Sequence, residues 1–194
     1  EAGTVREWAI SNLCPDPHGD GPDGAYHVTM DSGHEGTSSL NELTLAVNLL
    51  GHSVVVLRYD WKDFGDETNT LPLTFQGSAN GDGVAISADG ITWHRIANLY
   101  DPGRATDANQ NPPRQVGGLD ALDSDAEESA DTRADQYQTV TIDLDQAAAA
   151  AGIAYNKTFR IRFVQYDNNP IPTDGIALDN VKVLQGTGDP VITT

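Results

Sequence analysis

The chain of 194 residues carries 29 acidic and 11 basic side chains, a formal net charge of −18. This length fills one well-packed core and predicts a single domain. The acidic excess repels phosphates, which excludes a general nucleic-acid or anionic-membrane surface, but it attracts divalent cations. The only cysteine, Cys14, rules out an intramolecular disulfide and a cysteine-rich zinc site.

β-Strands account for most of the regular structure that the sequence predicts. Short runs of β-branched and apolar residues recur between turn signals, whereas helical periodicity is nearly absent. In chain order the predicted strands cover residues 6–11, 25–32, 41–49, 53–61, 83–88, 92–98, 137–144, 159–166 and 176–184. This pattern predicts an all-β fold in which two antiparallel sheets form a sandwich.

Local signals predict one tight turn and one helix. Asp89 and Gly90 separate two alternating runs in GVAISADGITWHRI, which predicts a two-residue hairpin turn in which both residues supply positive φ angles. A short helix is predicted over QAAAAAG, because alanine has the highest helix propensity. Asp145 is expected to cap its start and Gly152 to end it.

Two segments lack strand and helix patterns. Residues 13–24 read LCPDPHGDGPDG and form a loop by composition, and residues 101–136 are a long acidic stretch that we interpret as a mobile loop insertion. The chain starts without a signal-peptide pattern and ends in the linker-like QGTGDPVITT. We therefore expect one module over residues 1–185 and a linker over 186–194, cut from a larger secreted or cell-surface protein.

Three stretches carry a family resemblance. DGIALDNVKV resembles the closing strand of MAM-type and related jelly-roll modules, and VVVLRYDWKDFGDE resembles their central strand with its following loop. NGDGVAISADGITWHRI is similar to the next hairpin in bacterial extracellular modules of this shape. The resemblance spans residues 40–184, although the cysteines of animal MAM domains are missing. It implies a two-sheet jelly roll, carbohydrate-binding-module-like, that serves as an accessory module for glycans, proteins or ions.

Acidic loops at strand ends predict calcium binding, because calcium takes about six to eight oxygen ligands from carboxylates, amides, carbonyls and water. The predicted ligands are Asp66 and Glu67 in DFGDET, Asp82 in NGDG, and Asp167 and Asp174 in YDNNPIPTDG. The first and third loops each follow a strand that ends in Tyr-Asp. We expect these loops to meet at one rim if their strands lie in one sheet.

Asp179 interrupts the apolar run GIALDNVKV. Alternation places it on one face with Ala177, Val181 and Val183, where a carboxylate is costly unless a positive charge or a hydrogen-bond donor meets it. The resemblance implies that an aspartate in this last strand joins a structural calcium site, so Asp179 is a further predicted ligand. The alternative is a buried carboxylate that accepts hydrogen bonds from backbone or arginine donors.

Basic side chains on two strands predict a cationic strip. If the apolar residues of 53–61 and 159–166 face inward, Arg58 and the group Arg160, Arg162 and Tyr166 face outward. On neighbouring strands they would bind a uronic or sulfated glycan through charge-assisted pairs. The alternative is that the arginines pair with local acids such as Asp60.

Sugar rings stack on exposed aromatic faces. Trp61 and Phe64, in the loop that follows the fourth predicted strand, and Tyr166 at a strand end are the predicted sugar contacts. Trp8 and Trp93 lie within predicted strands and are assigned to the core.

Enzyme signatures are weak. The five histidines are scattered, and the sequence has no nucleophile elbow and no phosphate-binding loop. We therefore predict a non-catalytic, calcium-stabilised, glycan-binding accessory module with calcium as its cofactor and a polysaccharide as its partner. The alternatives are an adhesion or spacer module without a sugar site, and a glycan-cleaving jelly roll that uses paired carboxylates.

Overall fold

The structure is a computed structural model that describes residues 9–10, 27–31, 38–63, 66, 69–99, 137–168, 175–186 and 189–190. Several predictions fall outside these residues. They concern the loop at 13–24, the insertion at 101–136, and the side chains of Trp8, Cys14, Phe64, Glu67 and Asp174.

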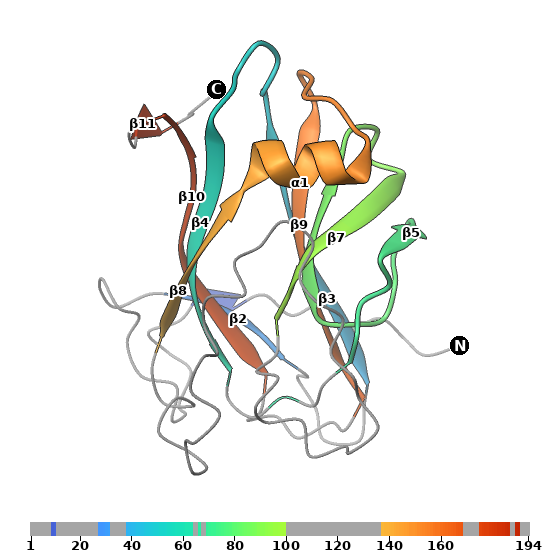
Figure 1. Ribbon diagram of the computed structural model, residues 1–194. Coiled ribbons are helices and arrows are strands. Elements are labelled where there is room, and N and C mark those ends of the chain that lie inside the picture. The colour runs from blue at the N-terminus through green and yellow to red at the C-terminus, as the bar shows by residue number, and fades with distance from the viewer. Residues whose placement is uncertain are drawn as a thin grey trace, which may run out of the picture.

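Two antiparallel sheets face each other in a sandwich (Figure 1). The strands are β1 (Ala9–Ile10), β2 (Val28–Met30), β3 (Ser39–Val47), β4 (Val55–Asp63), β5 (Thr74–Gln76), β6 (Gly83–Ser87), β7 (Thr92–Asn98), β8 (Gln138–Asp143), β9 (Phe159–Asp167), β10 (Ile176–Gln185) and β11 (Asp189–Pro190). The first sheet has the order β1-β2-β10-β4-β8, with β11 paired to β10, and the second has the order β3-β9-β6-β7-β5. The predicted all-β sandwich is therefore confirmed.

All nine predicted strands are present, eight with shifted bounds and β7 with the predicted ones, and two short strands were missed. β5 and β11 have three and two residues, too few for an alternating pattern to show. β11 pairs with Leu184 and Gln185 of β10, so part of the segment predicted as a linker joins the first sheet.

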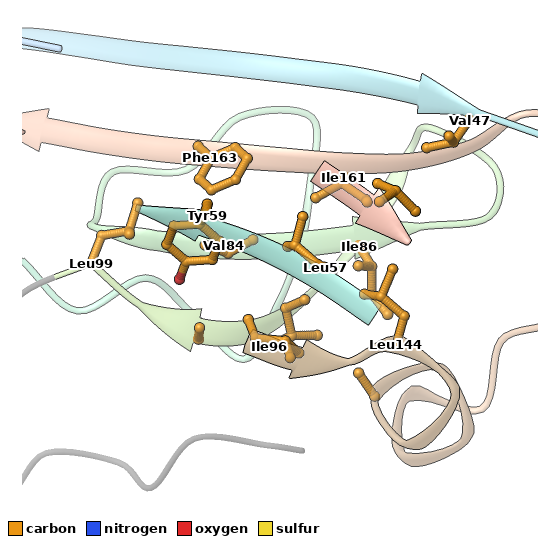
Figure 2. Packing of buried hydrophobic residues seen from close by; sticks show 14 of the residues in the cluster. Val47, Leu57, Tyr59, Val84, Ile86, Ile96, Leu99, Leu144, Ile161 and Phe163 are labelled. Atoms are coloured by element: carbon orange, nitrogen blue, oxygen red, sulfur yellow. The ribbon is translucent and has the colours of Figure 1, made fainter. Parts of the chain in front are cut away.

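Apolar side chains on the two inner faces form the main core. Leu57 and Tyr59 of β4 face Ile161 and Phe163 of β9 (Figure 2). The rings of Tyr59 and Phe163 meet edge to face, with centroids 5.1 Å apart and an interplanar angle of 85°. Complete burial raises the pKa of the Tyr59 phenol above its ordinary value.

A second apolar cluster covers the outer face of the second sheet. It comprises Leu71, Phe75, Ala85, Trp93 and Val164. Trp93 is fully buried, as predicted, and stacks on Phe75 with ring centroids 6.5 Å apart. The second sheet therefore carries buried apolar side chains on both faces.

Helix α1 (Leu144–Ala151) closes one end of the sandwich (Figure 1). Gly152 ends it with a φ of 68°, as predicted. The predicted cap Asp145 is wrong, because the helix starts one residue after Asp143, whose Oδ1 accepts the Gln146 N–H at 2.9 Å. Asp145 instead lies in the first turn, where its Oδ2 accepts the Val55 N–H at 2.9 Å and ties the helix to β4.

The loop between β6 and β7 has four residues instead of the predicted two. Gly90 adopts a φ of 75°, but Asp89 does not have a positive φ. Asp89 acts through its side chain, because its Oδ1 accepts the N–H groups of Ile91 and Thr92 at 2.7 and 2.8 Å. The Ser87 hydroxyl donates to the same oxygen at 3.0 Å.

We expect Asp89 to contribute a pH-dependent part of the stability. The hydrogen bonds from Ile91 and Thr92 lower its pKa from 3.8 to about 2. Because the folded-state pKa is depressed, this contribution is present above about pH 4 and is lost as the pH falls to about 2. The difference in urea midpoint between wild type and Asp89→Asn, which keeps the accepting oxygen without the charge, should shrink over that range. A difference that stays constant with pH would contradict this role.

Candidate functional site

Polar side chains replace apolar ones at one end of the inner face of the second sheet. In β3, Ser39 and Asn41 occupy inward-facing positions, and in β9, Gln165 and Asp167 do the same. All four side chains are almost completely buried. The apolar core thus ends in a buried polar layer, where each group needs a partner.

Hydrogen bonds connect this layer to the loop that follows β4. Asn41 Nδ2 donates to Gln165 Oε1 at 2.8 Å, and Gln165 Nε2 donates to the two carboxylate oxygens of Asp66 at 3.1 and 3.2 Å. The Asp66 N–H in turn donates to Asp63 Oδ1 at 3.0 Å. A loop that leaves the first sheet is therefore held against two strands of the second.

Asp82 connects a further pair of loops. It is fully buried, and its carboxylate accepts the N–H of Asn69 at 2.7 Å and the N–H of Tyr166 at 2.8 Å. Asn69 Nδ2 also donates to the Tyr166 carbonyl at 2.9 Å, and its Oδ1 accepts from Asn168 Nδ2 at 2.9 Å. The segment before β6 and the end of β9 are thereby locked together.

The structure brings Asp63, Asp66, Asp82 and Asp167 to one end of the sandwich, and we call these four residues the acidic rim. The loops after β4 and β9 were expected to meet because their strands would lie in one sheet, and this reason is wrong. β4 and β9 lie in opposite sheets, so the loops meet across the sandwich and not along one sheet. In the described part of the chain, no three His, Cys, Asp or Glu side chains form a group that could hold a metal ion.

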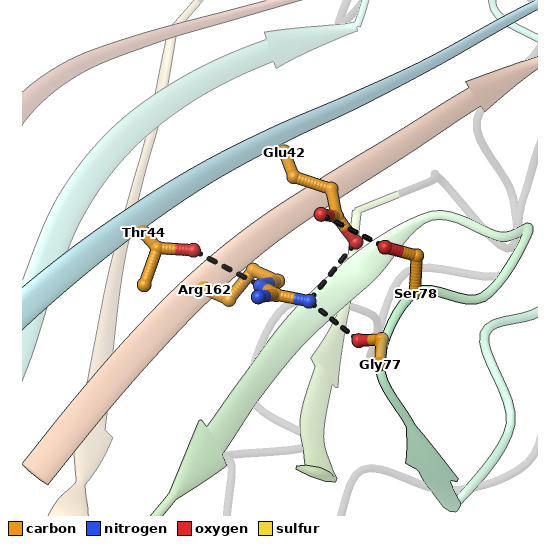
Figure 3. Close-up of polar contacts among 5 residues, drawn as sticks. All are labelled: Glu42, Thr44, Gly77, Ser78 and Arg162. Carbon is orange, nitrogen blue, oxygen red and sulfur yellow. Dashed lines mark hydrogen bonds and ion pairs between the residues drawn. The ribbon is translucent and has the colours of Figure 1, made fainter. Parts of the chain in front are cut away.

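The predicted cationic strip is not formed. Arg58 is on the outer face of the first sheet, whereas Arg160 and Arg162 are on the outer face of the second, so the core separates them. Arg162 follows the alternative reading, because it forms an ion pair with Glu42 at 3.0 Å (Figure 3). It also donates to Thr44 Oγ1 and the Gly77 carbonyl, and its guanidinium lies 3.7 Å from the ring centroid of Trp93.

Of the three aromatic residues predicted to contact a sugar, the structure describes Trp61 and Tyr166. Trp61 was expected in a loop, but β4 continues to Asp63, and Trp61 is 5% exposed within the main core. Its position two residues beyond Tyr59 turns it inward. Tyr166 is half-buried on the outer face of the second sheet, next to the acidic rim.

Asp179 lies away from the rim, on the outer face of the first sheet. The prediction that it shares a face with Val181 and Val183 is wrong, because a β-bulge between Asp179 and Lys182 breaks the alternation. Within the bulge Asn180 adopts a φ of 51°, a conformation that asparagine tolerates better than most residues. Asp179 therefore faces outward, directly opposite Asp60 of β4.

We call Asp60 and Asp179 the carboxylate pair. Asn180 Nδ2 donates to Asp60 Oδ2 at 2.8 Å, and its N–H donates to Asp179 Oδ1 at 2.7 Å. The Thr139 hydroxyl donates to the second oxygen of Asp60. Burial raises the pKa of the nearby Tyr137 phenol, and the charges of Asp179 and Asp60 raise it further.

The sequence interpretation named Asp66, Asp82, Asp167 and Asp179 as candidates, but it missed the polar groups that hold them in these two sites. Gln165 could have been found, because the alternation that turns Phe159, Ile161 and Phe163 inward also turns Gln165 inward. The pairing of Asp60 with Asp179 could not, because it depends on which strands are neighbours and on the bulge.

Comparison of the chain with protein-family models, with curated protein sequences and with solved structures finds no match. In the part of the chain that the structure describes, no helix has the length and apolar character needed to span a bilayer.

Proposed function

We propose that this chain is a non-catalytic accessory module of a secreted protein, stabilised by calcium at the acidic rim and able to bind a glycan. The observation that carries the proposal is the meeting of three acidic segments, predicted as calcium loops, at one end of the sandwich. Four mostly buried carboxylates within an acidic chain favour a cation. Calcium accepts amide and carbonyl oxygens as well, so the side-chain oxygens of Asn41 and Gln165 extend the available set.

A jelly-roll description is part of the proposal. It is supported by the strand order, in which β2, β10, β4 and β8 adjoin in one sheet and β3, β9, β6 and β7 adjoin in the other. The chain passes from one sheet to the other six times, between β2 and β3, β3 and β4, β4 and β5, β7 and β8, β8 and β9, and β9 and β10. Repeated crossing of this kind is typical of two interleaved Greek keys.

Tyr166 is the residue that we propose meets the sugar. Its backbone is fixed on both sides, since its N–H donates to Asp82 and its carbonyl accepts from Asn69. The half-buried ring would offer a stacking surface to a sugar, and a cation bound at the rim would supply coordination to its hydroxyl groups.

A spacer without a sugar site is the second candidate. It is favoured by the burial of Trp61 and by the engagement of Arg162 with Glu42 and Trp93, which remove predicted sugar contacts from the surface. Both candidates share the calcium-stabilised rim, so they differ only in ligand binding.

Calcium at about one hundred times its dissociation constant should raise the thermal midpoint by about 5–10 °C over a chelated sample. Asp66→Asn should reduce this rise, and Asn80→Ala, an exposed change near the rim, should not. An unchanged midpoint in wild type would refute the calcium proposal.

A glycan-array screen then separates the two candidates. If the module binds a glycan, Tyr166→Ala should abolish the array signal, and Ile91→Ala, at the opposite end of the sandwich, should retain it. A wild-type protein that gives no signal would favour the spacer.

A further inference from the structure

Exposed aliphatic side chains gather at the end of the sandwich that carries helix α1, opposite the acidic rim (Figure 1). Among the described residues, four large hydrophobic side chains are exposed, and three of them lie in loops at this end. Leu50 and Val54, in the loop between β3 and β4, are 55% and 63% exposed, and we call these two residues the aliphatic tip. Ile91 is the third and lies in the loop between β6 and β7. Single exposed apolar residues are ordinary on a protein surface, but a group of them at one end is typical of an interaction site.

Hydrogen bonds join the loops at this end. The Leu49 N–H donates to the Asn156 carbonyl at 2.9 Å, and Asn156 Nδ2 donates to the Ala88 carbonyl at 2.7 Å. The loop that precedes β9 therefore connects the loop between β3 and β4 to the loop between β6 and β7. A surface that is already ordered loses little conformational entropy when it binds a partner.

Val54 has a backbone conformation that is unfavourable for its side chain. Its φ is 58°, in the left-handed region, where a β-branched residue is an outlier and glycine or asparagine is better tolerated. Hydrogen bonds hold this conformation, because the Val54 carbonyl accepts the Gly186 N–H at 2.8 Å and the Val55 N–H donates to Asp145. The strained backbone thus holds an aliphatic side chain in solvent. The stability of a single chain does not account for valine at this position, whereas contact with a partner would.

The loops at this end carry little of the negative charge of the chain. Residues 48–54, 88–91 and 152–158 contain one acid, Asp89, and one base, Lys157, whereas the whole chain has a net charge of −18. Both side chains are exposed, and neither forms an ion pair with a described side chain. The two acids at the start of helix α1 are engaged by N–H groups. Two copies of an acidic chain repel each other, so these loops offer an approach with little repulsion.

We propose that two copies of this chain associate end to end through the aliphatic tip, as a symmetric dimer. In a two-fold interface the same surface meets itself, so Lys157 of each copy can pair with Asp89 of the other. The two acidic rims then point in opposite directions, which keeps their carboxylates apart. The tip is small compared with the roughly 800 Å² that each partner buries in a standard complex, so the dimer is weak and forms only at high protein concentration. This inference uses no rim residue and does not rest on calcium or glycan binding.

Sedimentation equilibrium over about a hundredfold range of protein concentration tests the dimer, since the mass of wild type should rise from that of a monomer toward that of a dimer. Val54→Asn and Leu50→Ser should each weaken association about tenfold or more, because each change removes an aliphatic side chain twice in a symmetric dimer. Leu73→Asn is the matched control. It makes the same kind of exchange at the fourth exposed aliphatic residue, which precedes β5 and lies away from this end, and it should associate as wild type does.

Thermal unfolding separates a loss of association from a folding defect. At low concentration, where both proteins are monomers, Val54→Asn should unfold at or above the wild-type midpoint, because asparagine tolerates this conformation better than valine. At high concentration only wild type should gain a higher midpoint, since the dimer stabilises the folded chain. The proposal is overturned if wild type stays monomeric over the whole range, if the two tip variants associate as strongly as wild type, or if Leu73→Asn loses association to the same extent.

Discussion

Replacing Asp82 with alanine should lower the free energy of unfolding by about 3–5 kcal/mol, because two charge-assisted hydrogen bonds are lost at a buried position. The carboxylate accepts the N–H groups of Asn69 and Tyr166, which belong to segments far apart in the sequence. Without it both N–H groups lose their acceptor, and the segment before β6 is released from the end of β9. Urea unfolding at neutral pH in chelator measures this effect without a contribution from bound calcium.

A graded set of variants separates this connection from general loop damage. Asp82→Asn keeps one accepting oxygen, so it should lose about half of the stability that Asp82→Ala loses. Asn80→Ala changes an exposed residue of the same loop and should have an effect below about 0.5 kcal/mol. If Asp82→Ala is no more destabilising than Asn80→Ala, the carboxylate does not connect these segments.

Replacing Phe163 with alanine should destabilise the sandwich by about 3–5 kcal/mol, the range for large-to-small changes of buried aromatic residues. Phe163 is fully buried between the sheets and meets Tyr59 edge to face. The substitution removes apolar contacts from both sheets at once and leaves a cavity that rigid strands fill poorly. Chemical denaturation with an unchanged m-value would show that stability, and not the unfolded state, has changed.

Phe163→Leu is the matched comparison, because it keeps most of the apolar volume and loses only the ring. It should cost about 1–2 kcal/mol. Equal effects of the leucine and alanine variants would mean that the ring does not fill the space between the sheets.

The sequence predicted which residues form strands much better than it predicted which strands are neighbours. Alternation in 159–166 correctly separates Ile161 and Phe163 from Arg160 and Arg162, because it depends only on the two-residue period of a strand. Sheet order depends on long-range pairing, which no local pattern encodes. This is why Arg58 was expected beside Arg162 although the two lie on opposite faces of the molecule.

Local deviations from ideal strands account for the other differences. The bulge at Asn180 reverses the face of Asp179 relative to Val183, and an alternation argument cannot include an extra residue. β4 extends through Trp61 to Asp63 because β10 continues to pair with it there, despite the polar residues that follow. The acidic rim was predictable in its residues, since each acid follows a strand or precedes one, but its geometry required the packing of the two sheets.

The place of β10 between β2 and β4 has a consequence for how the chain folds. Residues 176–185 are synthesised after all the strands that surround them, so β2 and β4 cannot be joined until the tenth strand arrives. Until then the edge of β4 presents unpaired backbone groups that another chain can pair with. Such distant pairings place folding in the slow class for all-β domains, on the order of milliseconds to seconds. The insertion of one late central strand thus sets the period during which the nascent protein is exposed to self-association.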